Sequence, residues 1–157
     1  MTVTFVPPGD RSNPYPMHAW EPTFDWEVKV NSVKLNADAD FSTPPRSGHQ
    51  YVVVNLSMTS LSTGNALPSQ VVYDIADAGV PTEGGSATKY EPFYCPSSLP
   101  PIQGGTIYAG ETATGNVCYE VASYDVSSLE LGGFYAYGPP YSTYYTGQAP
   151  MVWFGLE

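Results

Sequence analysis

The segment 24–30 alternates strictly between apolar and charged side chains, reading Phe-Asp-Trp-Glu-Val-Lys-Val. Successive side chains of a β-strand point to opposite faces, so a period of two gives one buried face and one solvated face. A helix would instead repeat its apolar residues every three or four positions. The segment therefore predicts an amphipathic strand, which we expect to continue through Val33 and Leu35.

Further strands are predicted at 2–6, 50–59, 71–75, 111–121, 128–131 and 151–154. Turn-forming residues separate them, and no segment has ten residues of helical periodicity. About seven or more short strands joined by turns are typical of an antiparallel, Ig-like β-sandwich. The predicted core residues are Trp26, Val28, Val30, Val52, Val54, Leu56, Val117, Tyr119 and Val121. We expect one parity error among them, that is, one place where the inward and outward faces of a strand are exchanged.

The composition agrees with an all-β fold. Only 13% of the 157 residues are charged, whereas the chain contains 13 Tyr, 15 Gly and 16 Pro. Helices draw on charged residues and alanine, whereas Tyr, Val and Thr favour strands. The length fits one domain. We predict a Pro-rich arm over 1–22 and a single sandwich over 23–157, which includes a Tyr/Gly/Pro-rich segment at 132–150.

The net charge of −10 limits the partners of this chain. Nucleic acid and anionic membrane surfaces would be repelled. No run of 18 apolar residues spans a membrane, so membrane association is expected only through a lipid anchor. The chain opens without a signal peptide. We interpret Met1 as a start placed after a removed leader, and Leu156-Glu157 as a cloning remnant, which predicts a secreted or cell-surface protein.

Cys95 and Cys118 are the only cysteines. Their spacing of 23 residues matches neither a CxxC redox motif nor a four-ligand zinc site. A disulfide is the simplest use for them, and the alternative is a pair of buried free thiols in a cytosolic protein. Closing a loop of this size would stabilise the fold by roughly 3 kcal/mol.

Two longer patterns resemble a known family. They are Trp-Glu-Val-Lys-Val-Asn-Ser-Val at 26–33, followed by the strand 51–59, and Ala-Gly-Glu-Thr-Ala-Thr-Gly-Asn-Val-Cys at 109–118. Over residues 24–131 the chain resembles the DUF4352 family of Ig-like extracellular domains, in the cysteine-bearing form of actinobacteria. The secreted mycobacterial antigen of the MPT63 type is a fold relative. The resemblance implies an Ig-like sandwich, export and a disulfide, and it implies no catalytic residues.

Metal binding is an alternative with little support in the sequence. His18 and His49, with Met17 and Met58, offer ligand types that suit copper, but they lack ligand spacing. Asp38 and Asp40 alternate as calcium ligands do, but the glycine and glutamate of a calcium loop are absent, so we interpret the segment as an acidic turn. We predict no metal site and no cofactor.

Catalytic patterns are equally weak. The chain has no Gly-x-Ser-x-Gly elbow, and a Ser-His-Asp triad would depend on two histidines in loops. Glu111, Glu120 and Glu130 lie on or beside strands rather than in a predicted cleft. We therefore predict a protein that is not an enzyme.

A tyrosine cluster is the best candidate binding surface. Tyrosine offers a large, rigid contact area and a hydroxyl group. The cluster either contacts a partner or covers one sheet as part of the structure. Its candidate binding residues are Tyr135, Tyr137, Tyr141, Tyr144 and Tyr145.

The sequence thus predicts a non-enzymatic extracellular interaction module. It would bind a protein partner or associate with itself through loops, edge strands and the arm. A small-ligand module for cell-wall carbohydrate, using aromatic stacking, is the first alternative. A metal-binding carrier is the second.

Overall fold

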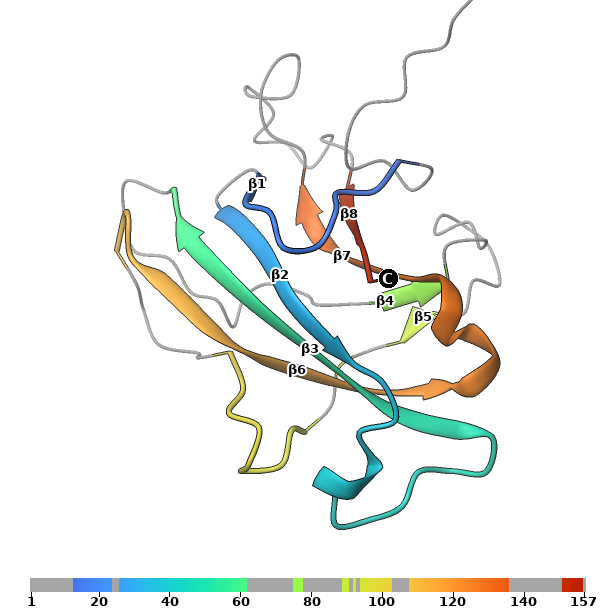
Figure 1. Cartoon of the computed structure of the whole chain (residues 1–157). Coiled ribbons are helices and arrows are strands. Elements are labelled where there is room, and N and C mark those ends of the chain that lie inside the picture. Colours follow the sequence, from blue (N-terminus) through green and yellow to red (C-terminus); the bar gives the residue numbers. More distant parts are fainter. Residues whose placement is uncertain are drawn as a thin grey trace, which may run out of the picture.

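The computed structural model describes residues 13–23, 26–61, 75–77, 89–90, 92, 94–102, 108–135 and 151–156. Two four-stranded sheets pack against each other (Figure 1). The first has the order β1-β2-β3-β6 and the second has the order β5-β4-β7-β8. All pairings between these strands are antiparallel, which confirms the predicted all-β, Ig-like sandwich.

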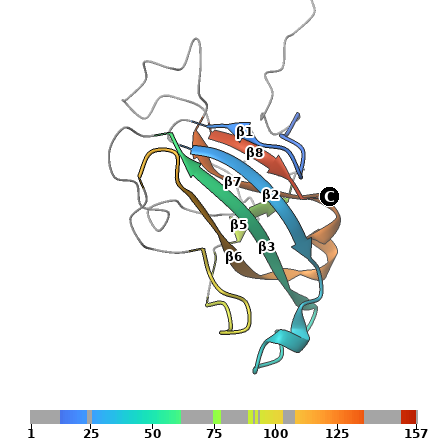
Figure 2. The same ribbon diagram turned by 60° about the vertical axis from the view of Figure 1, so that its left-hand side comes forward.

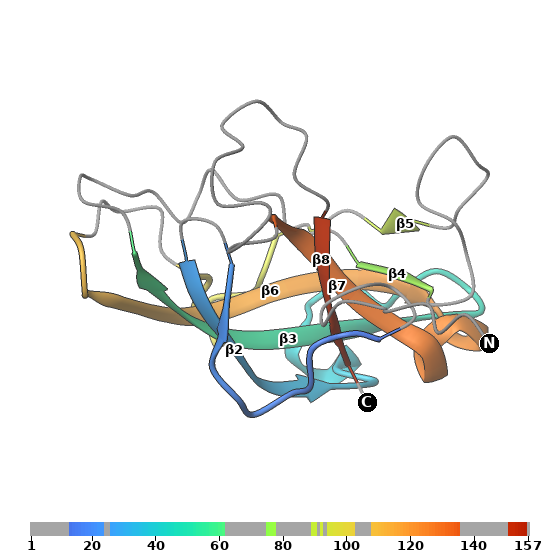
Figure 3. The ribbon, with the colours of Figure 1, turned by 90° about the horizontal axis from the view of Figure 1, so that it is seen from above.

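The strands of the first sheet are β1 (Glu21–Pro22), β2 (Trp26–Lys34), β3 (His49–Ser60) and β6 (Thr112–Ala122). Those of the second sheet are β4 (Ile75–Asp77), β5 (Lys89–Tyr90), β7 (Leu129–Tyr135) and β8 (Met151–Gly155). Two 3-10 turns are present in the described residues, η1 (Asp38–Asp40) and η3 (Ser123–Ser128). Figure 3 shows η3 leading from the end of β6 into β7, and so from one sheet to the other.

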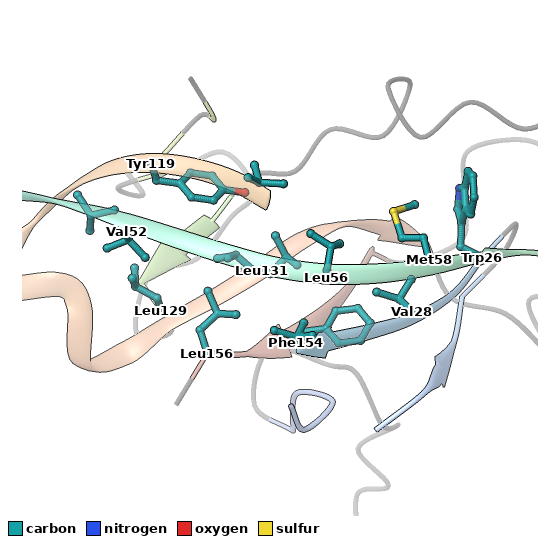
Figure 4. Packing of buried hydrophobic residues seen from close by; sticks show 14 residues of the cluster. Trp26, Val28, Val52, Leu56, Met58, Tyr119, Leu129, Leu131, Phe154 and Leu156 are labelled. Carbon is teal, nitrogen blue, oxygen red and sulfur yellow. The ribbon is translucent and has the colours of Figure 1, made fainter. Parts of the chain in front are cut away.

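The core lies between the sheets, where the inward side chains of β2, β3 and β6 meet β7 and β8 (Figure 4). All nine predicted core residues are buried, so the expected parity error is absent. Each fully buried side chain of the size of valine or leucine contributes about 1.5–3 kcal/mol. The structure adds residues from both sheets to this cluster, namely Met58, Leu129, Leu131, Phe154 and Leu156.

The alternation in β2 ends earlier than predicted. The register with β3 shifts between Val30 and Ser32, where a bulge interrupts the pairing. Val33 packs against the core, but β2 ends at Lys34, and Leu35 is 46% exposed. The bulge turns Val33 inward, but the prediction that the strand continues through Leu35 is wrong, because β2 ends one residue earlier, before the turn in which Asn36 has a φ of +51°.

Three sheet edges are covered by short segments that contain proline. Residues 13–18 pair with β8, β1 pairs with β2, and residues 100–102 pair with β6. Proline has no N–H to donate, so a segment of this kind ends a sheet instead of extending it. Among the described residues no helix is long and apolar enough to cross a membrane.

Candidate functional site

Residues 13–18, called the arm below, lie along the edge of β8. Tyr15 bridges Phe154 in parallel. The Tyr15 N–H donates to the Trp153 carbonyl at 2.8 Å, and the Gly155 N–H donates to the Tyr15 carbonyl at 2.9 Å. The arm therefore occupies this edge as an added strand, which is one of the ways in which proteins bind extended peptides.

Tyr15 anchors the arm through its side chain. Its ring packs against Phe154 with 5.4 Å between ring centroids and a tilt of 47°. Partial burial raises the pKa of the Tyr15 phenol, and the negative charge of Glu21 raises it further. Tyr15 and Met17 both pack against the main core. The arm is thus held by apolar contacts as well as by its main chain.

The arm then passes from one sheet to the other (Figure 2). The His18 N–H donates to the Val30 carbonyl at 2.9 Å, and β1 pairs with β2 shortly afterwards. His18 has a φ of +70°, a left-handed conformation that residues with a β-carbon seldom adopt. The main chain therefore bends sharply at His18, between the two sheet edges.

A groove of about 390 Å³ lies between the arm and the start of β7. Apolar and proline side chains make up much of its lining, and Glu130, only 4% exposed, adds a buried carboxylate. Carboxylate side chains are seldom buried in folded proteins. The lining residues are Pro14, Tyr15, Pro16, Met17, His18, Ser128, Leu129, Glu130 and Gly155.

A second surface of interest is the outer face of β2, β3 and β6, which points away from the core. Side-chain amides connect the three strands, because Asn31 donates to Asn55 at 2.9 Å and Asn55 donates to Asn116 at 2.9 Å. Hydroxyl pairs extend the same pattern, at 2.8 Å between Ser57 and Thr114. This outer polar ladder gives the face a regular array of hydrogen-bonding groups.

Trp20 lies beside the outer polar ladder and is 39% exposed. The Lys29 ammonium sits 5.4 Å from the centroid of its ring, a cation–π arrangement worth about 0.5–1 kcal/mol at an exposed site. Lys29 pairs in register with Ser57 of the ladder. An exposed indole ring next to amides and hydroxyls is a chemistry suited to sugar rings.

The Cys95–Cys118 disulfide is present, with 5.3 Å between the two Cα atoms. It fastens the 94–102 segment onto the other half of the same outer face. There, a second small apolar cluster includes Tyr51, Val53 and Cys118, with Leu99 packed against it. The disulfide therefore has a structural position, covering apolar residues that would otherwise face solvent.

The candidate metal ligands are not brought together. No group of three or more His, Cys, Asp or Glu side chains forms within the described residues. Asp38 accepts the Tyr51 N–H at 3.0 Å, and Asp40 pairs with Lys34. Both carboxylates of the acidic turn thus have structural partners, and His49 contacts the nearby Ser47 carbonyl.

The glutamates weighed for catalysis also have separate surroundings. Arg46 pairs with Glu120, and this hydrogen bond lowers the pKa of the Glu120 carboxyl. Glu111 is exposed, whereas Glu130 is buried beside the groove. The prediction that the protein is not an enzyme stays a prediction.

The predicted tyrosine surface lies mostly outside the described residues. Tyr135 ends β7, where its main chain pairs with Met151. The other four predicted residues, Tyr137, Tyr141, Tyr144 and Tyr145, fall outside the described part of the chain. The expected strand at 2–6 and the first four residues of the expected strand at 71–75 lie outside it as well.

A Pro-rich arm over 1–22 was predicted from the sequence, but the pairing of residues 13–18 with β8 and the outer polar ladder were not. The signal for the arm was the Pro-Tyr-Pro triplet at 14–16, because an aromatic residue between two prolines is extended and apolar. The signal for the ladder was the set of polar residues on the outward faces of three strands. This pattern cannot be told apart from that of ordinary solvent-exposed residues.

Known proteins resemble this chain in structure. The yjhA protein of Bacillus subtilis shares 11% identity, with a TM-score of 0.63 over 91% of this chain and 99% of that one. The ycdA protein of the same organism, assigned as a lipoprotein, shares 15% identity with a TM-score of 0.62 over 88% of this chain. The chain spans only 38% of the ycdA chain.

MPT63, a secreted protein of Mycobacterium tuberculosis, shares 15% identity, with a TM-score of 0.56 over 78% of this chain and 90% of that one. The expected fold relationship to MPT63 is thereby confirmed. No family model matches the chain, and no curated protein matches it. The resemblance to DUF4352 therefore stays a prediction, and the comparisons establish the β-sandwich fold alone.

Proposed function

We propose that this protein is a non-enzymatic, secreted or cell-surface module that binds a protein partner or a second copy of itself. The observation that carries the proposal is the arm on the edge of β8. There an extended segment is already held by main-chain hydrogen bonds and by the contact between Tyr15 and Phe154. An edge that accepts one such segment has the chemistry to accept another.

Two further observations support this proposal. The structural neighbours include a secreted protein and one assigned as a lipoprotein, which agrees with a location outside the cell. A disulfide also persists mainly in oxidising compartments.

Site-specific photo-cross-linking tests the protein-binding role. A benzoylphenylalanine introduced at Pro16, which is exposed and lines the groove, is expected to form an adduct with a partner on the surface of the producing cells. The control carries the same group at Thr114, on the outer face. Equal adducts at both positions, or none at Pro16, would contradict the proposal.

Carbohydrate binding is a second candidate, favoured by the exposed Trp20 beside the outer polar ladder. A pyranose ring would stack on the indole while the amides and hydroxyls bind its hydroxyl groups. On a glycan array, Trp20→Ala should abolish binding if this surface is used. Alanine at Tyr141, Tyr144 and Tyr145 should abolish it if the tyrosine cluster is used.

The matched control for the array is Tyr124→Ala, which removes an aromatic side chain that is 81% exposed. This variant should bind glycans as the parent protein does. An array on which the parent protein gives no signal would end the carbohydrate proposal.

A further inference from the structure

We propose that the arm exchanges between two copies of this chain, so that residues 13–18 of each copy fill the β8 edge of the other. This inference rests on the proposed interaction function and names its partner as a second copy. In a single copy the β8 edge is occupied by the arm of the same chain. The structure therefore shows which sequence the β8 edge accepts.

The acceptor edge fits the Pro-Tyr-Pro triplet closely. Tyr15 supplies one donor and one acceptor to β8, and its ring packs on Phe154. Pro14 lies against Gly155, with its Cγ 3.6 Å from where a β-carbon would stand. Every one of these contacts can form equally well between two copies, so exchange loses none of them, as in other domain-swapped dimers.

The bend at His18 opposes the closed, single-chain arrangement. Its φ of +70° places a residue with a β-carbon in the left-handed region, which costs free energy. When the arm binds a second copy, the main chain at His18 becomes extended. The free-energy cost of the left-handed conformation is then removed in both copies. Strain at a hinge of this kind is therefore released on exchange.

The prolines lower the entropic cost of presenting the arm. Pro14 and Pro16 each have a fixed φ and hold the preceding residue extended, so a released arm keeps much of the shape that β8 accepts. The net charge of −10 works against the meeting of two copies. Added salt screens this repulsion, and dimerisation should therefore strengthen with ionic strength.

Sedimentation of a dilution series tests the hinge. The parent protein is expected to show a monomer–dimer equilibrium, and His18→Gly should weaken the dimer roughly tenfold or more, because glycine tolerates the left-handed bend. The control is Asn36→Gly, at a residue with a φ of +51° in the turn after β2, far from the arm in sequence. It should leave the dimer unchanged. Parent protein that stays monomeric throughout would overturn the proposal.

Engineered cysteines test the exchange directly. All native cysteines are in the disulfide, so new thiols report only on their own positions. Pro14→Cys protein mixed with Gly155→Cys protein should form a disulfide-linked heterodimer. Pro14→Cys mixed with Thr114→Cys should not. The double variant Pro14→Cys/Gly155→Cys, oxidised at a dilution where the parent protein is monomeric, should close within one chain and sediment as a monomer.

The outcomes separate the two proposals. If the mixed variants fail to cross-link while the double variant closes within one chain, the arm stays on its own β8 edge and the exchange is wrong. A partner adduct at Pro16 would then still support the interaction function. If neither a heterodimer nor a Pro16 adduct forms, both proposals are overturned.

Discussion

At the scale of single residues, Gly115 is the glycine, among those in the described residues, at which a β-carbon would stand closest to its neighbours. A β-carbon at this position of β6 would stand 2.4 Å from both the N and the Cα of Ile102, and 2.7 Å from the carbonyl carbon of Pro101. These are backbone atoms, which cannot move aside as a flexible side chain can. Glycine is therefore what lets the 100–102 segment pair with the β6 edge.

Gly115→Ala should accordingly lower the free energy of unfolding by about 1–3 kcal/mol, the usual cost of overpacking. Urea denaturation measures this loss. The matched variant is Gly155→Ala, whose β-carbon would make contacts no closer than 3.6 Å and should cost little. Equal losses in both variants would show that the close approach of Ile102 is not the cause.

Tyr90 links the second sheet to the turn η3. Its hydroxyl donates to the buried Asp125 carboxylate at 2.5 Å and accepts the Ala122 N–H at 3.2 Å. Tyr90→Phe leaves both groups without this partner, so it should lower the free energy of unfolding by about 1–3 kcal/mol at neutral pH.

The same residue predicts a pH dependence. Burial, and then the hydrogen bond to Asp125, raise the pKa of the Tyr90 phenol above its ordinary value of 10.0. A raised folded-state pKa gives stability that is fully present below pH 10.0 and is lost as the pH rises through the folded-state value. Unfolding curves above pH 10.0 should therefore fall more steeply for the parent protein than for Tyr90→Phe. Parallel falls would show that Tyr90 does not cause the alkaline loss.

At the scale of elements, the 94–102 segment depends on the disulfide. The Cys95–Cys118 bond holds it over the second apolar cluster, at a sequence separation of 23 residues. Replacing both cysteines with alanine should lower the free energy of unfolding by roughly 3 kcal/mol. Limited proteolysis should then cut first within 94–102. A variant that resists proteolysis there would show that Pro101 and Ile102 hold the segment without the disulfide.

The long strands were predictable from sequence, whereas the edges and the site were not. In β2 polar and apolar side chains alternate as far as Val30, so the pattern indicates the inward face directly. The inward residues of β3 and β6 were also predicted correctly, although Tyr51, Val53 and Cys118 are buried on the outer face of these strands. The bulge after Val30 leaves no such mark, because it depends on register with β3. The pairing of Tyr15 with Phe154 joins residues far apart in sequence, and no local pattern reports a contact of that kind.

At the scale of the whole molecule, the arm connects the two sheets at one side of the sandwich. Its Tyr15 is bound to β8 in the second sheet, and its His18 is bound to β2 in the first. The hydrophobic core joins the same sheets through the centre, where Leu56 and Phe154 are fully buried. The sandwich therefore has a central connection that cannot open without unfolding and a peripheral connection that the proposed exchange would open.

Hydrogen exchange can separate these two connections, because amides that open together share one opening free energy. The Gly155 N–H donates to the Tyr15 carbonyl of the arm, whereas the His18 N–H of the arm donates to the Val30 carbonyl of β2. If the arm leaves as a unit, the two amides should show equal protection, below that of Val54 in β3. In the double variant Pro14→Cys/Gly155→Cys, the protection of both amides from exchange should rise equally, and the protection of the Val54 amide should not change. Unequal protection of Gly155 and His18 would mean that the arm frays residue by residue, and arm exchange would lose its opening step.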